Sequence, residues 1–257
     1  AEGVIAGATP AAQARSAYEL MLDKGWTDAA LRAGALSTGF DLWRAVAAGY
    51  ASAYGRYGVG QHPCGFSFAA QNPDFSPRAA TAAERAAWIA DGSGIPPGAG
   101  VGLLDSKVQL PDLTYPGLKC LRGLWDGQGE DARRVQAGIE ATRAGLPRSG
   151  LPVMVVHGTD DGLIPPAFSS APYVAAAKAA GREVNYWQVR HVQHFDGFLG
   201  LPDYGARYLP LLPYVHAALD RVQARLDKGT PLPADAVIQT TPRMGKPLSA
   251  ENLALPR

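Results

Sequence analysis

Several features that would assign a function class are missing from this sequence. No apolar run approaches the roughly 20 residues that a membrane-spanning helix needs. The formal net charge is +1, with charges spread along the chain, so neither nucleic acid nor an anionic membrane is an expected partner. The first residues, AEGVIAGATP, do not combine a basic segment with an apolar one, so no targeting signal is visible.

Cysteine is also scarce. Cys64 and Cys120 are too few for a disulfide scaffold and lack the spacing of metal ligands. They could form one bridge, as would suit an exported protein, or remain two buried thiols. The histidines show no HExxH or paired spacing, so no metal or other cofactor is predicted. His62, in a Gly/Pro loop, and His216, in a helical pattern, are interpreted as structural.

A serine in a G-x-S-x-G turn is missing as well. Ser67, in CGFSFAA, and Ser37, in LSTG, come closest to this motif. Neither is surrounded by strand, turn and helix patterns, and Ala69 stands where the motif around Ser67 needs a second glycine. Both serines are therefore predicted to be ordinary loop residues rather than nucleophiles.

The chain is nonetheless long enough for a large core. It has 257 residues, of which 47% are hydrophobic. Residues 1–150 show helical patterns separated by Gly/Pro-rich loops, and they are interpreted as a region of helices and loops. The helices are expected to begin at Thr9, Thr27, Asp41, Thr81 and Glu130, and the loops to cover 55–65, 72–77 and 92–102.

The pattern changes after residue 150. A strand over 152–157, a helix over 170–180 and a strand over 183–189 predict one βαβ unit with parallel strands. A helix over 211–228 follows, and residues 151–229 are predicted to form the C-terminal part of an α/β core. Residues 230–257 are interpreted as a Pro-rich, unpatterned tail. A two-stranded parallel sheet cannot cover its own faces and edges, so further strands are expected from elsewhere.

Acidic and histidine side chains follow these two strands. Asp161 comes after the first strand and His194 after the second, which is the order of acid and histidine in an α/β-hydrolase triad. In such a triad the histidine takes the nucleophile's proton and the acid orients it. Asp160 and His191 are the alternatives, but Asp160 is expected to stabilise the turn and His191 directly abuts the strand. We therefore predict Asp161 and His194 as the catalytic pair.

His157, at the end of the first strand, is expected to pack against the sheet edge rather than to react. The aromatic residues of the first half could line an apolar substrate pocket or form the insertion's own core. These are Trp43, Tyr50, Tyr54, Tyr57, Phe66 and Phe68.

Longer motifs point to one family. GWTDAAL, AAGYASAYGRYGVGQHPCGFSFAA, GSGIPPGAGV, KCLRGL, HGTDDGLIPP, QHFDGF and GTPLPADAVIQTTPR occur in this order. Together they resemble the C-terminal part of the D-(−)-3-hydroxybutyrate oligomer hydrolases. The resemblance implies a secreted or periplasmic serine carboxylesterase of the α/β-hydrolase fold, which cuts short 3-hydroxybutyrate oligomers to monomers. It also implies that Asp161 and His194 are the triad acid and base, and that residues 1–150 form a lid-like insertion.

The nucleophile of this family lies in an S-x-S-N-G-G turn well upstream of the matched region, and this sequence contains no such turn. We therefore expect the serine to be absent from the chain and the chain alone to be inactive. Two other functions stay open at this point. One is a hydrolase similar to tannases and feruloyl esterases, and the other is a non-catalytic binding protein that is similar to a hydrolase.

Overall fold

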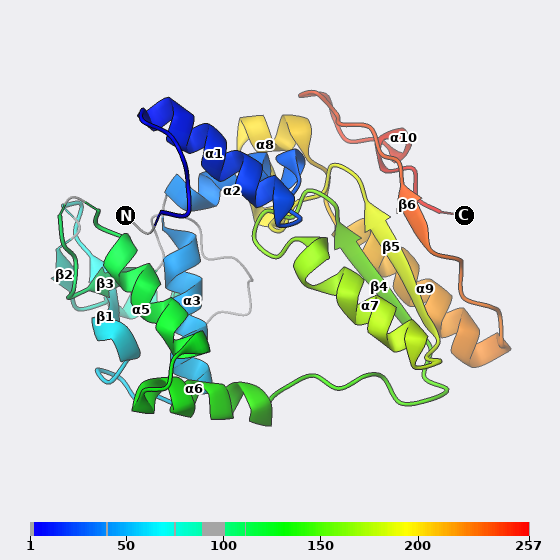
Figure 1. Cartoon of the computed structure of the whole chain (residues 1–257). Coiled ribbons are helices and arrows are strands. Elements are labelled where there is room, and N and C mark those ends of the chain that lie inside the picture. Colours follow the sequence, from blue (N-terminus) through cyan, green and yellow to red (C-terminus); the bar gives the residue numbers. More distant parts are fainter. Residues whose placement is uncertain (1–2, 40, 75, 89–100, 111, 257) are drawn as a thin grey trace. The chain divides into compact units, whose positions relative to one another are not determined.

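The computed structural model describes residues 3–39, 41–74, 76–88, 101–110 and 112–256. It contains both helices and strands, so the structure is of the mixed α/β type (Figure 1). The chain divides into two units. Unit 1 contains residues 1–36 and 146–257, and unit 2 contains residues 37–145.

Unit 1 is built around a parallel sheet of three strands. They are β4 (Val153–Gly158), β5 (Val184–Val189) and β6 (Ala236–Ile238), in the order β4-β5-β6. Both pairs are parallel, and Val153 lies opposite Val184. The predicted strands 152–157 and 183–189 are confirmed within one residue, and α7 (Ser170–Ala179) joins them as predicted.

Strand β6 corrects the interpretation of residues 230–257 as an unpatterned tail. Its three residues pair with the end of β5, and α10 (Ala250–Leu253) follows. Leu253 of this helix joins the buried core of unit 1. A strand of three residues after a Pro-rich run is too short to show an alternating pattern, which is why the sequence does not reveal it.

Helices cover both faces of the parallel sheet. On one face, Val174 and Ala177 of α7 pack against Val184 and Tyr186. On the other, Trp187 and Val189 pack against α9 (Leu212–Lys228), which confirms the predicted helix over 211–228. Figure 1 shows α7 and α9 on opposite sides of β4 and β5. The sequence predicts a two-stranded sheet that cannot cover its own faces. In the structure, helices of the same unit cover both faces.

The first helices also belong to unit 1. In α1 (Pro10–Asp23), Thr9 caps the helix, and its Oγ1 accepts the backbone N–H of Ala12 at 3.2 Å, as predicted. Most of α2 (Asp28–Gly39) lies in unit 1, where Ala33 is buried against Tyr204 of α8 (Pro202–Arg207). The expected insertion over 1–150 therefore does not coincide with unit 2, because α2 packs against the C-terminal helix α8.

Unit 2 contains helices and an antiparallel sheet. The helices are α3 (Leu42–Tyr54), α4 (Ala82–Trp88), α5 (Tyr115–Asp126) and α6 (Glu130–Ala141). The strands are β1 (Phe66–Gln71), β2 (Pro77–Arg78) and β3 (Gly102–Asp105), in the order β2-β1-β3.

The helical and loop prediction for this region missed the sheet and α5. Strand β1, FSFAAQ, has no β-branched residue, and its partners are only two and four residues long. The capping box of α4 is confirmed, because Thr81 and Glu84 exchange backbone-to-side-chain hydrogen bonds. Most of the predicted loop over 92–102 lies outside the described residues.

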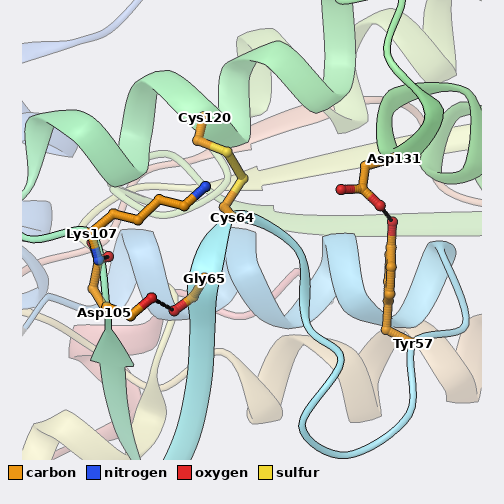
Figure 2. Close-up of a disulfide and its surroundings, with 8 residues drawn as sticks. Tyr57, Cys64, Gly65, Asp105, Lys107, Cys120 and Asp131 are labelled. Atoms are coloured by element: carbon orange, nitrogen blue, oxygen red, sulfur yellow. Dashed lines mark hydrogen bonds between the residues drawn. A yellow bond between two sulfur atoms is a disulfide. The ribbon is translucent and has the colours of Figure 1, made fainter.

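A disulfide connects two elements of unit 2. Cys64 and Cys120 are bonded with their Cα atoms 5.7 Å apart, so the bridged alternative is confirmed. Figure 2 shows the bond reaching from the segment before β1 to α5. Phe66, Leu124 and Val135 form a buried core with Cys64, and Tyr54, Tyr57 and Phe68 pack against it. The aromatic residues of this core thus serve unit 2's own packing.

Candidate active site

The loop after β4 is wrapped around a single carboxylate, that of Asp161. Its Oδ1 accepts the backbone N–H groups of Leu163 at 2.9 Å and Ile164 at 2.7 Å. The residue is only 5% exposed. A side chain that accepts from backbone groups two and three residues ahead closes a local turn, which fixes the carboxylate at the end of the strand.

Two glycines flank this turn because other backbone segments approach it closely. A Cβ atom on Gly158 would lie 2.2 Å from the carbonyl oxygen of Val192, in the loop after β5. A Cβ atom on Gly162 would lie 2.3 Å from the carbonyl oxygen of Ala30 in α2. Any side chain at either position would push these segments apart, so the glycines set how near α2 and the His194 loop lie to Asp161.

His194 is the histidine that reaches this carboxylate from the neighbouring strand. Its Nδ1 lies 2.8 Å from Asp161 Oδ2. The side chain of His194 is 30% exposed, compared with 7% for that of Asp161. The two residues follow adjacent parallel strands, so the predicted geometry of the pair is confirmed. Within the described part of the chain, the Nε2 atom of His194 has no hydrogen-bond partner.

The two alternative residues make other contacts. His191 Nδ1 lies 3.0 Å from Thr240 Oγ1, and its φ of 53° directs the chain into the loop that carries His194. Asp160 accepts a hydrogen bond from Thr159 Oγ1 at 2.6 Å, while its backbone N–H donates to Val192. Neither residue is paired with Asp161 or His194, and Asp160 holds the turn together as predicted.

The structure adds a second histidine that the sequence interpretation missed. His157 Nε2 lies 3.2 Å from Asp161 Oδ2, the oxygen that also contacts His194. Its Nδ1 lies 2.6 Å from Ser170 Oγ at the start of α7. His157 lies on β4, the edge strand of the described parallel sheet, as predicted, but the sequence interpretation missed that its ring contacts the acid.

These contacts keep Asp161 ionised. Burial raises the pKa of this carboxyl, but hydrogen bonds from His157 and His194 and from the backbone of Ile164 lower it more. The net pKa lies well below the usual range of an aspartic acid. An ionised Asp161 requires Nδ1 of His194 to carry its proton, which leaves Nε2 as the basic atom of a neutral ring.

The two candidate serines do not lie in strand-to-helix turns. Ser67 lies inside strand β1, paired with Leu104 of β3. Ser37 is 4% exposed within α2. The prediction that both are loop residues was therefore wrong, because one lies in a strand and the other in a helix. The expectation that neither occupies a strand-to-helix turn agrees with these positions.

Comparison with known proteins identifies a family of hydrolases. The model of that family, described as 3HB-oligomer hydrolase, matches residues 1–256. A protein named D-(-)-3-hydroxybutyrate oligomer hydrolase from Paracidovorax citrulli is 36% identical over 97% of this chain and 38% of its own length. Proteins of the same name from Azoarcus sp. and Cupriavidus necator are 36% and 34% identical, over 96% and 95% of this chain.

The chain belongs to the 3HB-oligomer hydrolase family. It spans 37–38% of the length of these three relatives. No solved structure matches it. A helix able to cross a membrane is not found in the part of the chain that the structure describes.

Proposed function

We propose that these residues are the acid-and-base part of a carboxylesterase that hydrolyses short 3-hydroxybutyrate oligomers to monomers. The observation that carries the proposal is the 2.8 Å contact between His194 Nδ1 and Asp161 Oδ2 at the ends of adjacent parallel strands. The names of the relatives support the substrate. In this proposal unit 1 is the C-terminal part of an α/β-hydrolase core, and unit 2 is a lid-like insertion.

The mechanism follows from the protonation of the pair. Nε2 of His194 takes the proton of a serine hydroxyl as the serine attacks the ester carbonyl. Asp161 holds the ring in the tautomer this step needs and stabilises the imidazolium that forms. His194 then returns the proton to the leaving alcohol, and the acyl-enzyme is hydrolysed by water in the same way. Neither a metal nor another cofactor is needed.

The serine and the oxyanion hole are assigned to sequence outside these 257 residues. This assignment rests on the positions of Ser37 and Ser67 and on the upstream S-x-S-N-G-G turn that the family resemblance implies. The same resemblance suggests a secreted or periplasmic location, and the disulfide supports it, since such bonds persist in oxidising compartments. The only partner proposed is the ester substrate; no nucleic acid or membrane is involved.

The test compares this chain with a longer protein that includes the upstream segment. The longer protein should hydrolyse 3-hydroxybutyrate dimer, and the 257-residue chain should not. His194→Ala should abolish turnover in the longer protein. His191→Asn is the matched control, because asparagine tolerates the left-handed backbone at this position and the side chain is not paired with Asp161. Undiminished hydrolysis by His194→Ala would overturn the proposal.

A further inference from the structure

The second histidine on Asp161 is part of a longer hydrogen-bonded chain. His157 Nδ1 lies 2.6 Å from Ser170 Oγ, and Ser170 Oγ lies 2.5 Å from Tyr186 Oη. His157 Nε2 lies 3.2 Å from Asp161 Oδ2. The side chain of His157 is 14% exposed, less than half the value for His194. The chain thus runs from under α7 to the acid of the candidate active site.

The acid fixes the direction of the first hydrogen bond, and a neutral ring of His157 then sets the direction of the others. An ionised carboxylate only accepts, so Nε2 of His157 must carry a proton and donate to Asp161. In a neutral ring Nδ1 is then an acceptor, and it accepts the hydroxyl proton of Ser170. Ser170 in turn accepts from the phenol of Tyr186, whose pKa burial raises, so the phenol keeps its proton. Every group in the chain is satisfied when His157 is neutral.

The carboxylate of Asp161 is then held on all sides. Oδ1 accepts from two backbone N–H groups, and Oδ2 accepts from both histidines. A carboxylate has about four acceptor positions, so the set is complete. Rotation of the carboxylate would break hydrogen bonds to His157 and to the backbone together. His194 is the more exposed of its two histidine partners.

We propose that His157 is a positioning residue that fixes Oδ2 of Asp161 against Nδ1 of His194. It acts as a neutral donor, so the full charge of Asp161 remains available to the imidazolium of His194. Ser170 and Tyr186 set the tautomer of His157. This role deepens the proposed hydrolase function and rests on it.

Ser170, His157 and Asp161 could also be regarded as a triad of their own. The structure favours the positioning role, because Ser170 Oγ already has both His157 and Tyr186 as partners beneath α7. A nucleophilic serine needs its hydroxyl directed at the substrate. Replacement of Ser170 separates the two roles.

The first experiment measures hydrolysis of 3-hydroxybutyrate dimer by variants of the longer protein. His157→Leu should lower kcat about 10- to 100-fold with KM nearly unchanged, as for loss of a hydrogen bond to a charged group. His157→Gln can place an N–H near the former Nε2 and should recover most of kcat. His216→Leu, at an exposed position on α9, is the control. Ser170→Ala and Tyr186→Phe should have smaller effects than His157→Leu.

The second experiment does not depend on turnover. Solid-state nitrogen NMR of isotope-labelled histidine reports which ring nitrogens carry protons. In the wild-type protein His157 should be neutral and protonated at Nε2, and His194 at Nδ1. In His157→Leu the signals of His194 should split between two tautomers, and in His157→Gln they should return to one.

The outcomes separate the two proposals. Equal loss of kcat in the Leu and Gln variants, in step with a lower melting temperature, would show that His157 only supports the fold. An imidazolium at His157, or an unchanged His194 spectrum in His157→Leu, would also overturn the positioning role. Loss of all turnover in Ser170→Ala would make Ser170 the nucleophile and refute it too. Full activity of His194→Ala would refute the proposed mechanism, while the NMR result still decides the position of the rings.

Discussion

Replacing Asp161 by asparagine changes one atom and should remove most of the activity. The loop donates two backbone N–H groups to one oxygen, so the asparagine oxygen will take that position. The new amide group then lies where Oδ2 faces His194 and His157. The new amide N–H and the Nδ1–H of His194 would then face each other as two donors. His194 relieves this conflict only by carrying its proton on Nε2. In that tautomer it cannot accept the serine proton.

The magnitude follows from this tautomer change. An asparagine in place of a triad aspartate lowers kcat by about 10⁴-fold, or about 5.5 kcal/mol of transition-state stabilisation. The assay is hydrolysis of 3-hydroxybutyrate dimer by the longer protein. Asp160→Asn is the matched control. This neighbouring carboxylate accepts a hydrogen bond from the Thr159 hydroxyl and is not paired with a histidine, so kcat should stay within a few-fold of wild type. If Asp161→Asn kept more than a tenth of kcat, or Asp160→Asn were the more damaging change, the assignment would be refuted.

The same variant should alter stability at acid pH. The pKa of Asp161 is lower in the folded protein than its unfolded value of about 3.9. The carboxylate therefore stabilises the fold above that unfolded value, and the contribution is lost as pH falls through the folded pKa. Asp161→Asn lacks this contribution at every pH. The difference in unfolding free energy between wild type and variant should be greatest near neutral pH and shrink below about pH 4, as measured by urea denaturation.

Three further predictions concern the supporting structure. Gly162→Ala should destabilise unit 1 and lower kcat, because its Cβ would lie 2.3 Å from the Ala30 carbonyl oxygen; Gly197→Ala, with no atom within 4 Å, is the control. Reduction of the Cys64–Cys120 bond, which spans 56 residues, should lower the unfolding free energy of unit 2 by about 4 kcal/mol in urea denaturation, and a Cys64→Ser/Cys120→Ser variant should no longer respond to reductant. Arg44→Leu should cost about 3–5 kcal/mol in the same assay, because it leaves the Asp105 carboxylate, whose side chain is 1% exposed, without its cation; Arg122→Leu, in an exposed pair, should cost under about 1 kcal/mol.

The sequence predicts those parts of unit 1 whose pattern is local. Strands β4 and β5 are rich in β-branched and aromatic residues, and α9 repeats its apolar residues at helical spacing, so each is visible in a short window. Asp161 and His194 follow from them, because parallel strands bring their carboxyl ends to one edge. The elements that the sequence did not reveal are positioned by contacts with residues far away in the sequence. Strand β6 is defined by its pairing with β5, and the place of α2 by its packing on Gly162 and Tyr204.

The position of His157 along β4 indicates in the sequence itself that its ring needs polar partners. Side chains alternate along a strand, so His157 lies on the same face as Val153 and Val155. These valines pack in the cluster with Tyr186 and α7. A histidine placed in line with partly buried valines needs polar partners for both ring nitrogens. In the structure these partners are Asp161, four residues further on, and Ser170, which begins the next helix.

The choice between two adjacent carboxylates also has a physical basis in the turn that follows them. Asp161 precedes Gly162, which has no side chain to prevent the chain from folding back, so the N–H groups of Leu163 and Ile164 reach Oδ1. Asp160 precedes Asp161 and has its backbone N–H bound to Val192, so its side chain turns to Thr159 instead. Because the turn occupies only one oxygen of Asp161, Oδ2 is left for the two histidines. The order Asp-Asp-Gly therefore selects the second carboxylate as the acid that His194 contacts.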